Sequence, residues 1–400
     1  MKVLQINTVC GSGSIGRIAV DLLKTLEENG HESIIAYGRG NCAEKVKTIK
    51  IGSDIDNYIH VAKTRIFDKQ GFASKNSTKE LIKKINEYNP DIIHLHNIHG
   101  YYLNIEILFD YLKKINKPIV WTLHDCWAFT GHCAYFEYEQ CHKWKSQCNN
   151  CIQKKEYPSS LLIDNSRWNF KKKKELFSGI KNMTIITPSN WLAKLVKESF
   201  LSQYEIKVIN NGIDLEAFKP IESNLREKYN IEDKFIILGV ASEWTRRKGF
   251  DYFLKLANKL DNKYKIIMVG INKKQEKLLG NNVIGIRRTN NVKELAEIYS
   301  LADVFVNTTL EDNFPTTNLE ALACGTPVIT FNTGGSVESI DEDTGIIVEK
   351  GNLDMLCDKI QEINSDFNLK CRDRAIKNYN KYDRFNDYIN MYDDIIKKIQ

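Results

Sequence analysis

Short apolar runs alternate with amphipathic stretches along almost the whole chain. The runs are rich in Ile and Val and lie between polar or Gly-containing segments, which is typical of strands buried on both faces of a sheet. Between them, apolar residues recur at helical spacing, most clearly in 14–30, where Gly30 ends the pattern, and in 249–264. The predicted strands are KVLQINTV, ESIIAYG, DIIHLHN, PIVWTLHD, MTIITPS, KVINNGI, KFIILGVAS, KIIMVGI, VIGIRR, DVFVNTT, PVITFNT and GIIVE.

This alternation predicts an α/β protein with parallel sheets that helices cover on both faces. The 400 residues exceed what one hydrophobic core usually organises, so we expect two facing, Rossmann-like, doubly wound domains with a cleft between them. A polar segment with one Pro at 210–233 marks the boundary, and we place the domains at 1–215 and 216–381. The amphipathic tail, 382–400, fits either domain by its pattern alone.

The composition argues against a membrane-spanning or secreted protein. No stretch of about 18 uncharged apolar residues occurs, and the start MKVLQINTVCGS lacks a basic segment followed by a long apolar one. We therefore expect a cytoplasmic protein. Thiols in that compartment are kept reduced, so the ten cysteines are expected to be free thiols or metal ligands.

The charge is distributed unevenly along the chain. Residues 1–215 carry 30 basic against 22 acidic residues, whereas the remainder carries 27 against 29. NFKKKKELF (169–177) and LIKKINEY (81–88) place lysines beside aromatic and aliphatic residues, which would suit peripheral contact with the anionic inner face of a cell membrane. The alternative is an ordinary solvated face.

Candidate ligand-binding residues follow the predicted strands, because ligands of open parallel sheets bind at the carboxyl ends of strands. After the first strand, CGSGSIGR (10–17) places Gly11, Gly13 and Gly16 at the spacing of a dinucleotide-binding turn, at a helix start that favours a phosphate or a sugar hydroxyl. The second strand, however, leads into AYGRG and lacks the acidic residue of that motif. The turn is therefore either a ligand loop or a tight turn.

The second domain presents a cluster of cations after its first strand. In VASEWTRRKGFDYF (240–253), Arg246, Arg247 and Lys248 lie at a helix start, where positive charges oppose the helix dipole unless an anion binds there. Such side chains are suited to a diphosphate. The alternative is an exposed basic turn.

Two carboxylates follow further along the chain. Asp312 and Glu320 bracket a loop that enters a helix, within TTLEDNFPTTNLEALACGTPVITFNTGG (308–335). Carboxylates in this position can accept hydrogen bonds from the vicinal hydroxyls of a sugar or a ribose. Acidic residues at a helix start also serve as ordinary caps, so both interpretations remain open.

These segments together resemble a known family. In order and spacing, over most of residues 1–350, the chain resembles the retaining glycosyltransferases of family 4, which have the GT-B fold. WTLHDCWAFTGHC further resembles a branch that builds bacterial capsule, exopolysaccharide and O-antigen chains. The resemblance implies a nucleotide-sugar donor and an amphipathic tail that crosses back to the first domain. It rests on VINNGID (208–214), RRKG (246–249), EDNFPTTNLEALACGTPVI (311–329) and TGG (333–335).

The resemblance also implies roles for residues of the second domain. Glu320 matches the ligand of the donor's ribose hydroxyls, and Lys248 matches the lysine that binds the donor diphosphate. Asp312, where the family usually has Glu, would contact the hydroxyls of the donor sugar. The family's arginine falls at Ser242 or Glu243 here, so Arg246 or Arg247 must supply that second charge.

In the first domain, the resemblance points to two places. Gly11 and Gly13 match the loop near the acceptor and the donor phosphate, and His124 matches the histidine that faces the transferring sugar. His124 and Asp125 end a predicted strand, so both are expected to point toward the reaction cleft. With Lys248 and Asp312, His124 completes the predicted catalytic set. No Asp-x-Asp motif appears in strand context, so no catalytic metal is expected.

A cysteine-rich segment follows His124. Its spacing, C-x7-C-x6-C-x2-C, could supply four thiolates to a structural zinc ion, with His132 and His142 as spare ligands. Reduced buried cysteines, or an iron–sulfur or redox role, are the alternatives. A closed four-thiolate site leaves no open coordination position, so catalysis would not use the metal. The four ligands would be Cys133, Cys141, Cys148 and Cys151.

The leading hypothesis is an enzyme that transfers a hexose from a nucleotide sugar to a glycan carried on a polyprenyl diphosphate. A nucleotide-sugar epimerase or a soluble-glycan synthase on the same fold is the alternative among enzymes. Outside enzymes, the basic charge and the cysteines suggest a zinc-stabilised nucleic-acid-binding protein. Against this, the basic residues do not alternate with aromatic residues on a recognisable nucleic-acid-binding module.

Overall fold

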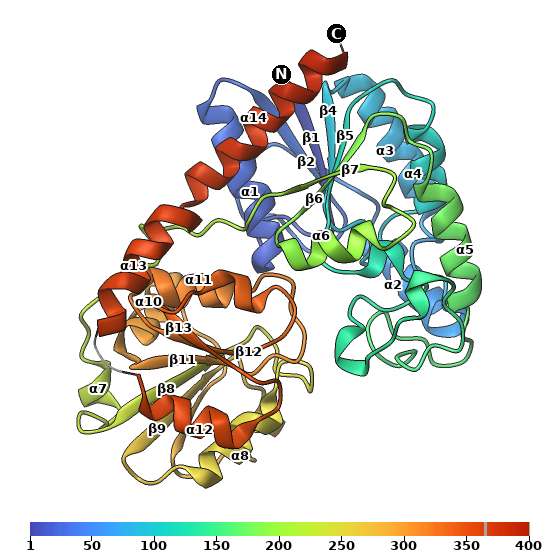
Figure 1. The fold of residues 1–400 in the computed structure, drawn as a ribbon. Coiled ribbons are helices and arrows are strands. Elements are labelled where there is room, and N and C mark those ends of the chain that lie inside the picture. Colours follow the sequence, from blue (N-terminus) through green and yellow to red (C-terminus); the bar gives the residue numbers. More distant parts are fainter. Residues whose placement is uncertain (364–365, 400) are drawn as a thin grey trace. The chain divides into compact units, whose positions relative to one another are not determined.

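A computed structural model describes residues 1–363 and 366–399 of the chain (Figure 1). The chain divides into two compact units, which are described separately. The first unit comprises Met1–Asn210 and Phe385–Gln400, and the second comprises Asn211–Arg384.

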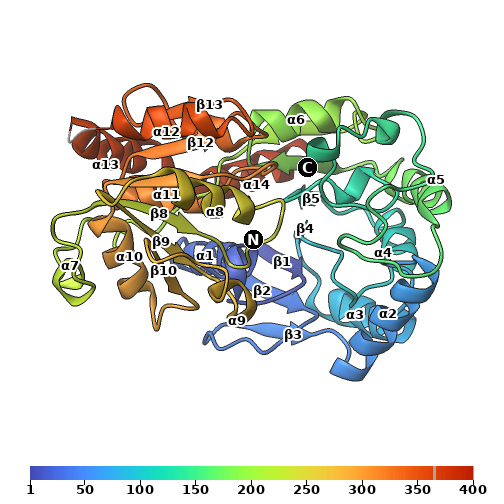
Figure 2. The ribbon, with the colours of Figure 1, turned by 90° about the horizontal axis from the view of Figure 1, so that it is seen from below.

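The first unit is built on a seven-stranded sheet. The strands are β1 (Lys2–Asn7), β2 (Glu32–Tyr37), β3 (Thr48–Lys50), β4 (Ile92–Leu95), β5 (Ile119–Thr122), β6 (Met183–Thr187) and β7 (Glu205–Val208). Their order is β3-β2-β1-β4-β5-β6-β7, all neighbours are parallel, and Figure 2 shows β3 at the edge beside β2. Within β1, Val3 packs on one face whereas Leu4 and Ile6 pack on the other, so both faces are buried.

Helices cover both faces of this sheet. The helices of this unit are α1 (Gly13–Glu28), α2 (Asp54–Phe67), α3 (Lys75–Tyr88), α4 (Ile105–Leu112), α5 (Ser166–Phe177), α6 (Asn190–Lys197) and α14 (Lys381–Ile399). α1 and α14 share one face, where Leu22 and Tyr392 belong to the same apolar cluster (Figure 1). α3, α4 and α5 contribute Leu81, Phe109 and Phe177 to the cluster on the other face.

α14 completes the face that α1 covers only in part. Phe385, Tyr388 and Tyr392 pack against residues of the central strands. Tyr392 Oη lies 2.6 Å from His94 Nδ1, and Tyr388 Oη lies 3.3 Å from Thr122 Oγ1. The amphipathic tail therefore belongs, from Phe385 onward, to the core of the first unit.

The second unit has a six-stranded sheet. The strands are β8 (Phe235–Val240), β9 (Tyr264–Val269), β10 (Val283–Ile286), β11 (Val304–Asn307), β12 (Val328–Phe331) and β13 (Gly345–Val348). All neighbours are parallel, in the order β10-β9-β8-β11-β12-β13. The helices are α7 (Leu225–Lys228), α8 (Phe250–Lys259), α9 (Lys273–Glu276), α10 (Val292–Leu301), α11 (Thr316–Ala323), α12 (Leu353–Gln361) and α13 (Asp366–Tyr379). α8 and α12 cover one face, and α10, α11 and α13 cover the other.

Each sheet reverses its strand order once. In the first sheet, α1 follows β1 and α4 follows β4, and these helices pack on opposite faces. In the second sheet, α8 follows β8 and α11 follows β11, again on opposite faces. The loops after such a strand pair diverge and leave room for a ligand at the carboxyl ends of the strands.

The structure confirms the predicted α/β class with two doubly wound parallel sheets. β3 was not predicted, because its three residues are only half-buried and carry a weak apolar signal. The predicted helix 249–264 ends at Lys259, since Leu260 is already extended. Within the described residues, no helix is both long and apolar enough to span a bilayer.

Candidate functional site

In the second unit, the loops after β8 and β11 bring two predicted site residues into contact. Lys248 Nζ lies 2.5 Å from Asp312 Oδ2, and Arg247 Nη1 lies 3.7 Å from the same oxygen. The two loops are also joined through their main chains, because Leu310 N donates to Arg247 O at 2.7 Å. Residues far apart in sequence meet here because β8 and β11 are neighbours at the reversal of strand order.

Gly249 allows the two loops to approach each other closely. Its φ of +80° lies in the left-handed region, and a Cβ atom at this position would lie 2.2 Å from Thr308 O. Any larger residue would therefore push the β8 loop away from the β11 loop. Gly249 directly follows Lys248 and caps the start of α8, so its small size keeps the lysine beside Asp312.

Charge and burial act against each other in this cluster. Burial lowers the pKa of Lys248, and Asp312 offsets part of that effect. Burial acts to raise the pKa of Asp312, but the charges of Lys248 and Arg247 outweigh it and hold the pKa below its usual value. One ionised carboxylate thus faces two cationic side chains.

Of the two arginines, Arg247 belongs to this cluster. Its guanidinium also donates from Nη1 to Glu311 O at 2.5 Å, and its side chain is largely buried. Arg246 lies exposed on the same turn. Arg247 is therefore the residue placed to supply the second charge beside Lys248.

Glu320 lies on α11 and is 4% exposed. Its Oε2 accepts a hydrogen bond from Tyr299 Oη at 2.9 Å, which fixes the orientation of the carboxylate. Tyr299 is itself buried on α10. The sequence analysis did not single out Tyr299, because only the packing of α10 beside α11 brings the two side chains together.

In the first unit, the glycine-rich turn follows β1. Gly11 and Gly13 have φ values of +71° and +63°, in the left-handed region that favours glycine. A Cβ atom on Gly11 would lie 2.9 Å from Glu44 Cγ, whereas Gly13 has no neighbouring atom within 4 Å of that position. Gly13 therefore borders open space at the start of α1.

A disulfide ties this turn to the loop after β2, contrary to the expectation that all cysteines are free thiols or metal ligands. It joins Cys10 to Cys42, whose Cα atoms lie 5.0 Å apart. That expectation rested on the compartment, whereas the pairing follows from the geometry: β1 and β2 are adjacent, so the loops that follow them meet.

A chain of hydrogen bonds ends at His124. Gln5 Nε2 donates to Ala19 O at 3.0 Å, so Gln5 Oε1 is the atom that faces His96 Nε2, also at 3.0 Å. An amide oxygen only accepts, so His96 Nε2 carries a proton. Burial lowers the pKa of His96 well below its usual value, which leaves the ring neutral and His96 Nδ1 as an acceptor.

His96 Nδ1 lies 3.2 Å from His124 Nε2, which must therefore donate. Burial lowers the pKa of His124 to about 4, so this ring is neutral too and carries its single proton on Nε2. The remaining nitrogen, Nδ1, is unprotonated. Gln5 and His96 thus determine which nitrogen of His124 can accept a hydrogen bond, and the sequence analysis identified neither residue.

Asp125 lies beside His124 at the end of β5. Its Oδ2 lies 2.8 Å from His99 Nε2, and its Oδ1 accepts from Trp127 N at 2.9 Å. Burial acts to raise the pKa of Asp125, but His99 and the hydrogen bonds outweigh it and lower the pKa. His96, His99, His124, Asp125 and Trp127 line a pocket at the carboxyl ends of β4 and β5.

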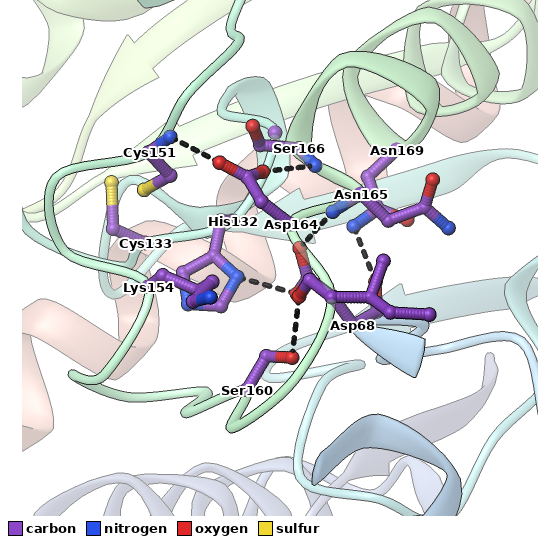
Figure 3. A network of polar contacts seen from close by, with 12 residues as sticks. Asp68, His132, Cys133, Cys151, Lys154, Ser160, Asp164, Asn165, Ser166 and Asn169 are labelled. Carbon is purple, nitrogen blue, oxygen red and sulfur yellow. Dashed lines mark hydrogen bonds and ion pairs between the residues drawn. The ribbon is translucent and has the colours of Figure 1, made fainter. Parts of the chain in front are cut away.

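The cysteine-rich segment is organised by a buried ion pair. His132 Nδ1 lies 2.5 Å from Asp68 Oδ1, and Asp68 Oδ2 accepts from Asn165 N at 2.8 Å (Figure 3). Asp164 in turn accepts from Cys151 N at 2.5 Å. Burial acts to lower the pKa of His132, but Asp68 outweighs it and raises the pKa. The ion pair therefore fixes the segment to the residue that follows α2.

The predicted zinc site is not supported. Among the residues that the structure describes, no group of three or more His, Cys, Asp or Glu side chains could hold a metal ion. The Cys133 thiol is hydrogen-bonded to Cys151, and Cys148 Sγ accepts from Gly131 N at 3.2 Å. The hydrogen bond from Cys133, against the opposing effect of burial, lowers the pKa of Cys151 to about 7. The spacing suited a metal, but these cysteines, with Cys141, are free thiols.

Two family models match the chain. The model described as "Glycosyl transferases group 1" matches residues 222–382, within the unit that holds Lys248, Asp312 and Glu320. The model described as "Glycosyltransferase Family 4" matches residues 15–217, about half of the chain. The chain belongs to glycosyltransferase family 4. This membership favours an enzyme over the nucleic-acid-binding alternative.

Individual relatives of this family 4 glycosyltransferase were also found. The "Putative colanic acid biosynthesis glycosyl transferase WcaC" of Escherichia coli (strain K12) is 26% identical over 368 residues, which cover 88% of each chain. The "N,N'-diacetylbacillosaminyl-diphospho-undecaprenol alpha-1,3-N-acetylgalactosaminyltransferase" of Campylobacter jejuni is 28% identical over 224 residues, 52% of this chain and 59% of that protein.

The fold matches solved structures over nearly its full length. A sucrose-phosphate synthase from Thermosynechococcus elongatus superimposes with a TM-score of 0.76 at 18% identity, and covers 99% of both chains. At this identity the likeness concerns the fold alone. It confirms the GT-B fold expected from the resemblance to family 4.

The order of hydrogen bonds around His124 predicts a spectroscopic result. Nitrogen NMR of protein labelled at histidine should show His124 and His96 as neutral rings protonated at Nε2 at pH 7. The Gln5→Leu variant removes the acceptor for His96 and should produce a mixture of tautomers at both rings. Gln275→Leu, which removes an amide that donates to Trp244 O in the second unit, should leave the histidine spectrum unchanged. A His124 protonated at Nδ1 in the unmodified protein contradicts the assignment.

The buried histidines predict a loss of stability in mild acid. Burial lowers the pKa of His60 and His94 to about 3 and that of His124 to about 4, below the value of about 6.5 in an unfolded chain. The unfolded state therefore binds more protons below pH 6.5, and stability falls as the pH falls. Each ring should lower the free energy of unfolding by about 1 to 2 kcal/mol between pH 7 and pH 5.

Urea denaturation at pH 7 and at pH 5 measures this loss. His142 is exposed, so His142→Asn should leave the difference between the two pH values unchanged. Equal unfolding free energies at both pH values would show that these rings are not held neutral.

Proposed function

We propose that the protein is a hexosyltransferase that moves a hexose, with retention, from a nucleotide-sugar donor to a lipid-linked glycan in surface-polysaccharide synthesis. The observation that carries this proposal is the contact of Lys248 and Arg247 with Asp312 at the reversal of strand order in the second sheet. Family membership supports the reaction class. The names of relatives, one in colanic acid synthesis and one acting on a diphospho-undecaprenol, support the pathway and the acceptor class.

In this proposal the cationic cluster binds the donor diphosphate. The positive charges of Arg247 and Lys248 and the amide groups at the start of α8 stabilise the phosphate oxygens. Asp312 contacts hydroxyls of the donor sugar, and Glu320, oriented by Tyr299, accepts hydrogen bonds from the ribose hydroxyls. The basic turn is then an anion site rather than a solvated surface.

The reaction needs a stabilised leaving group more than a strong base. The bond between the anomeric carbon and the diphosphate oxygen breaks, and the acceptor hydroxyl forms its new bond on the same face of the sugar. The acceptor proton passes to the departing diphosphate. Lys248 and Arg247 stabilise the charge that develops on phosphate, so no metal ion is required for catalysis in this scheme.

In the first unit, His124 positions the transferring sugar. A neutral imidazole with an unprotonated Nδ1 can accept a hydrogen bond from a sugar hydroxyl. Gly13, at the open start of α1, lets main-chain N–H groups approach the acceptor or the donor phosphate, and Gly11 shapes the same turn. His124 thus acts by orientation and not as a nucleophile.

The acceptor in this proposal is a glycan attached to a polyprenyl diphosphate. Its polyprenyl chain lies in a membrane, so the enzyme works in the cytoplasm at the inner membrane face, in peripheral contact with anionic lipids. A soluble-glycan synthase on the same fold would need no such contact. The acceptor requirement therefore separates the two alternatives.

Substitution of the donor-site residues tests the proposal. Lys248→Ala removes the charge that balances the diphosphate, and Glu320→Ala removes the ribose acceptor. Each should lower the release of nucleoside diphosphate by about 100-fold or more. The assay offers a panel of nucleotide sugars together with a polyprenyl-diphosphate glycan.

Lys277→Ala provides a matched control, because Lys277 is an exposed lysine of the same unit that lies outside the β8 loop in sequence. Its turnover should equal that of the unmodified protein. Full activity of Lys248→Ala or Glu320→Ala would refute the donor site. Release of nucleoside diphosphate only with water-soluble acceptors would favour the soluble-glycan alternative.

A further inference from the structure

α2 in the first unit buries polar residues and exposes apolar ones, which is the reverse of the usual arrangement in a surface helix. Its buried residues are polar: Asn57, His60 and Thr64, which recur at helical spacing. Its outward face carries Ile55, Tyr58, Ile59, Ile66 and Phe67. A surface helix normally buries its apolar stripe and exposes its polar one, so the orientation of α2 requires a reason.

Specific hydrogen bonds hold α2 in this orientation. Asn57 Nδ2 donates to Gly38 O at 3.0 Å, and His60 Nδ1 lies 2.9 Å from Ser74 Oγ. His60 Nε2 accepts from Gly71 N at 3.1 Å. A rotation of the helix to bury its apolar stripe would break these hydrogen bonds.

A neighbouring loop extends the apolar surface beyond the end of α2. Leu161, Leu162 and Ile163 are 64%, 69% and 44% exposed. The loop is fixed beside the helix, because Leu161 N donates to Arg65 O at 2.8 Å and Asn165 Nδ2 donates to Phe67 O at 3.4 Å. We call the outward residues of α2 together with 161–163 the apolar face.

Cations surround the end of the apolar face that the loop forms. Lys63 and Lys69 are exposed at the carboxyl-terminal end of α2, and Lys69 Nζ lies 4.7 Å from the centre of the Trp168 ring. Lys155 and Arg167 flank the loop on its other side in sequence. Of the acidic residues nearby, Asp68 pairs with His132 and Asp164 accepts two main-chain hydrogen bonds. Asp54 and Asp56 lie at the opposite end of α2. Glu156 is exposed and offsets one of the four cations.

The two basic runs noted in the sequence do not form a comparable surface. In 169–177, Lys173 is buried, and its Nζ donates to Trp127 O at 2.8 Å. Phe170 and Phe177 of that run are buried as well. In 81–88, Leu81 and Ile85 belong to the core of the first unit, and Ile82 is half-buried. Neither run itself therefore contains an exposed large apolar side chain.

We propose that the apolar face docks on a bilayer that contains anionic lipid, with α2 lying in the plane of the interface. This inference rests on the proposed function, because a lipid-linked acceptor must be reached at a membrane. The aliphatic side chains enter the acyl boundary, Tyr58 and Trp168 lie at the headgroup level, and the surrounding lysines contact lipid phosphates. A protein-binding face of this size would be expected to hold few lysines around it, since lysine is depleted at protein interfaces.

Vesicle co-sedimentation of the full chain tests the proposal without any enzymatic readout. The protein should bind vesicles of phosphatidylglycerol and phosphatidylcholine in equal amounts, and should bind pure phosphatidylcholine less. Added salt should weaken binding to the mixed vesicles, because it screens the lysines. The variant Ile59→Ser/Leu161→Ser/Leu162→Ser should partition to mixed vesicles at least about tenfold more weakly.

A matched control removes one Ile and two Leu that are equally exposed in the second unit. Leu278→Ser/Leu369→Ser/Ile376→Ser should bind vesicles as the unmodified protein does. Thermal melting checks that both variants fold, and Leu161→Ser/Leu162→Ser is the milder substitute if the triple variant does not. Light scattering reports the molecular mass of each variant in solution.

Three outcomes overturn the proposal. They are an unmodified protein that ignores anionic vesicles, a triple variant that binds them normally, and a triple variant that only converts a dimer into a monomer. The last would make a second copy of the chain the occupant of the apolar face. If vesicles bind but no nucleotide sugar is consumed with any acceptor, the proposed function fails while the docking face remains.

Discussion

Where neighbouring parallel strands send their helices to opposite faces of a sheet, the loops that follow the strands diverge, and this constraint positions the candidate residues of each unit. It acts between β1 and β4 in the first sheet and between β8 and β11 in the second. Gly11 and Gly13 follow β1, His96 follows β4, and Lys248 and Asp312 follow β8 and β11. Residues that are distant in sequence therefore meet because of strand order.

The charged cluster of the second unit and the histidines of the first unit differ in their electrostatics. In the second unit, two cations contact one carboxylate in a largely buried cluster. In the first unit, burial keeps the histidines neutral, and their hydrogen bonds assign each proton to one nitrogen. The first of these groups is suited to charge and the second to directional hydrogen bonding.

The sequence was sufficient for the strands and for the candidate residues that follow them. Strands buried on both faces are continuous apolar runs, and a parallel sheet places its ligand loops at known ends of these runs. Tyr299, Gln5 and His96 could not be found in this way, because their roles depend on which side chains face each other across helices and strands.

The cysteines show that spacing in a sequence does not by itself establish a metal site. Their spacing was compatible with a metal, yet the structure pairs Cys10 with Cys42 and leaves the four predicted ligands as thiols. Spacing along a chain reports only which residues can be close. Whether their sulfur atoms converge on one point depends on the path of the loop between them, here fixed by Asp68 and Asp164.

The position of α14 has a consequence for folding during synthesis. Tyr388 and Tyr392 fill the core of the first unit, and Tyr388 contacts Thr122 across 266 residues of sequence. During synthesis, the first unit emerges before the second, but its central strands stay partly uncovered until α14 has been made. The second unit can therefore complete its core before the first unit does, although the first unit is synthesised earlier.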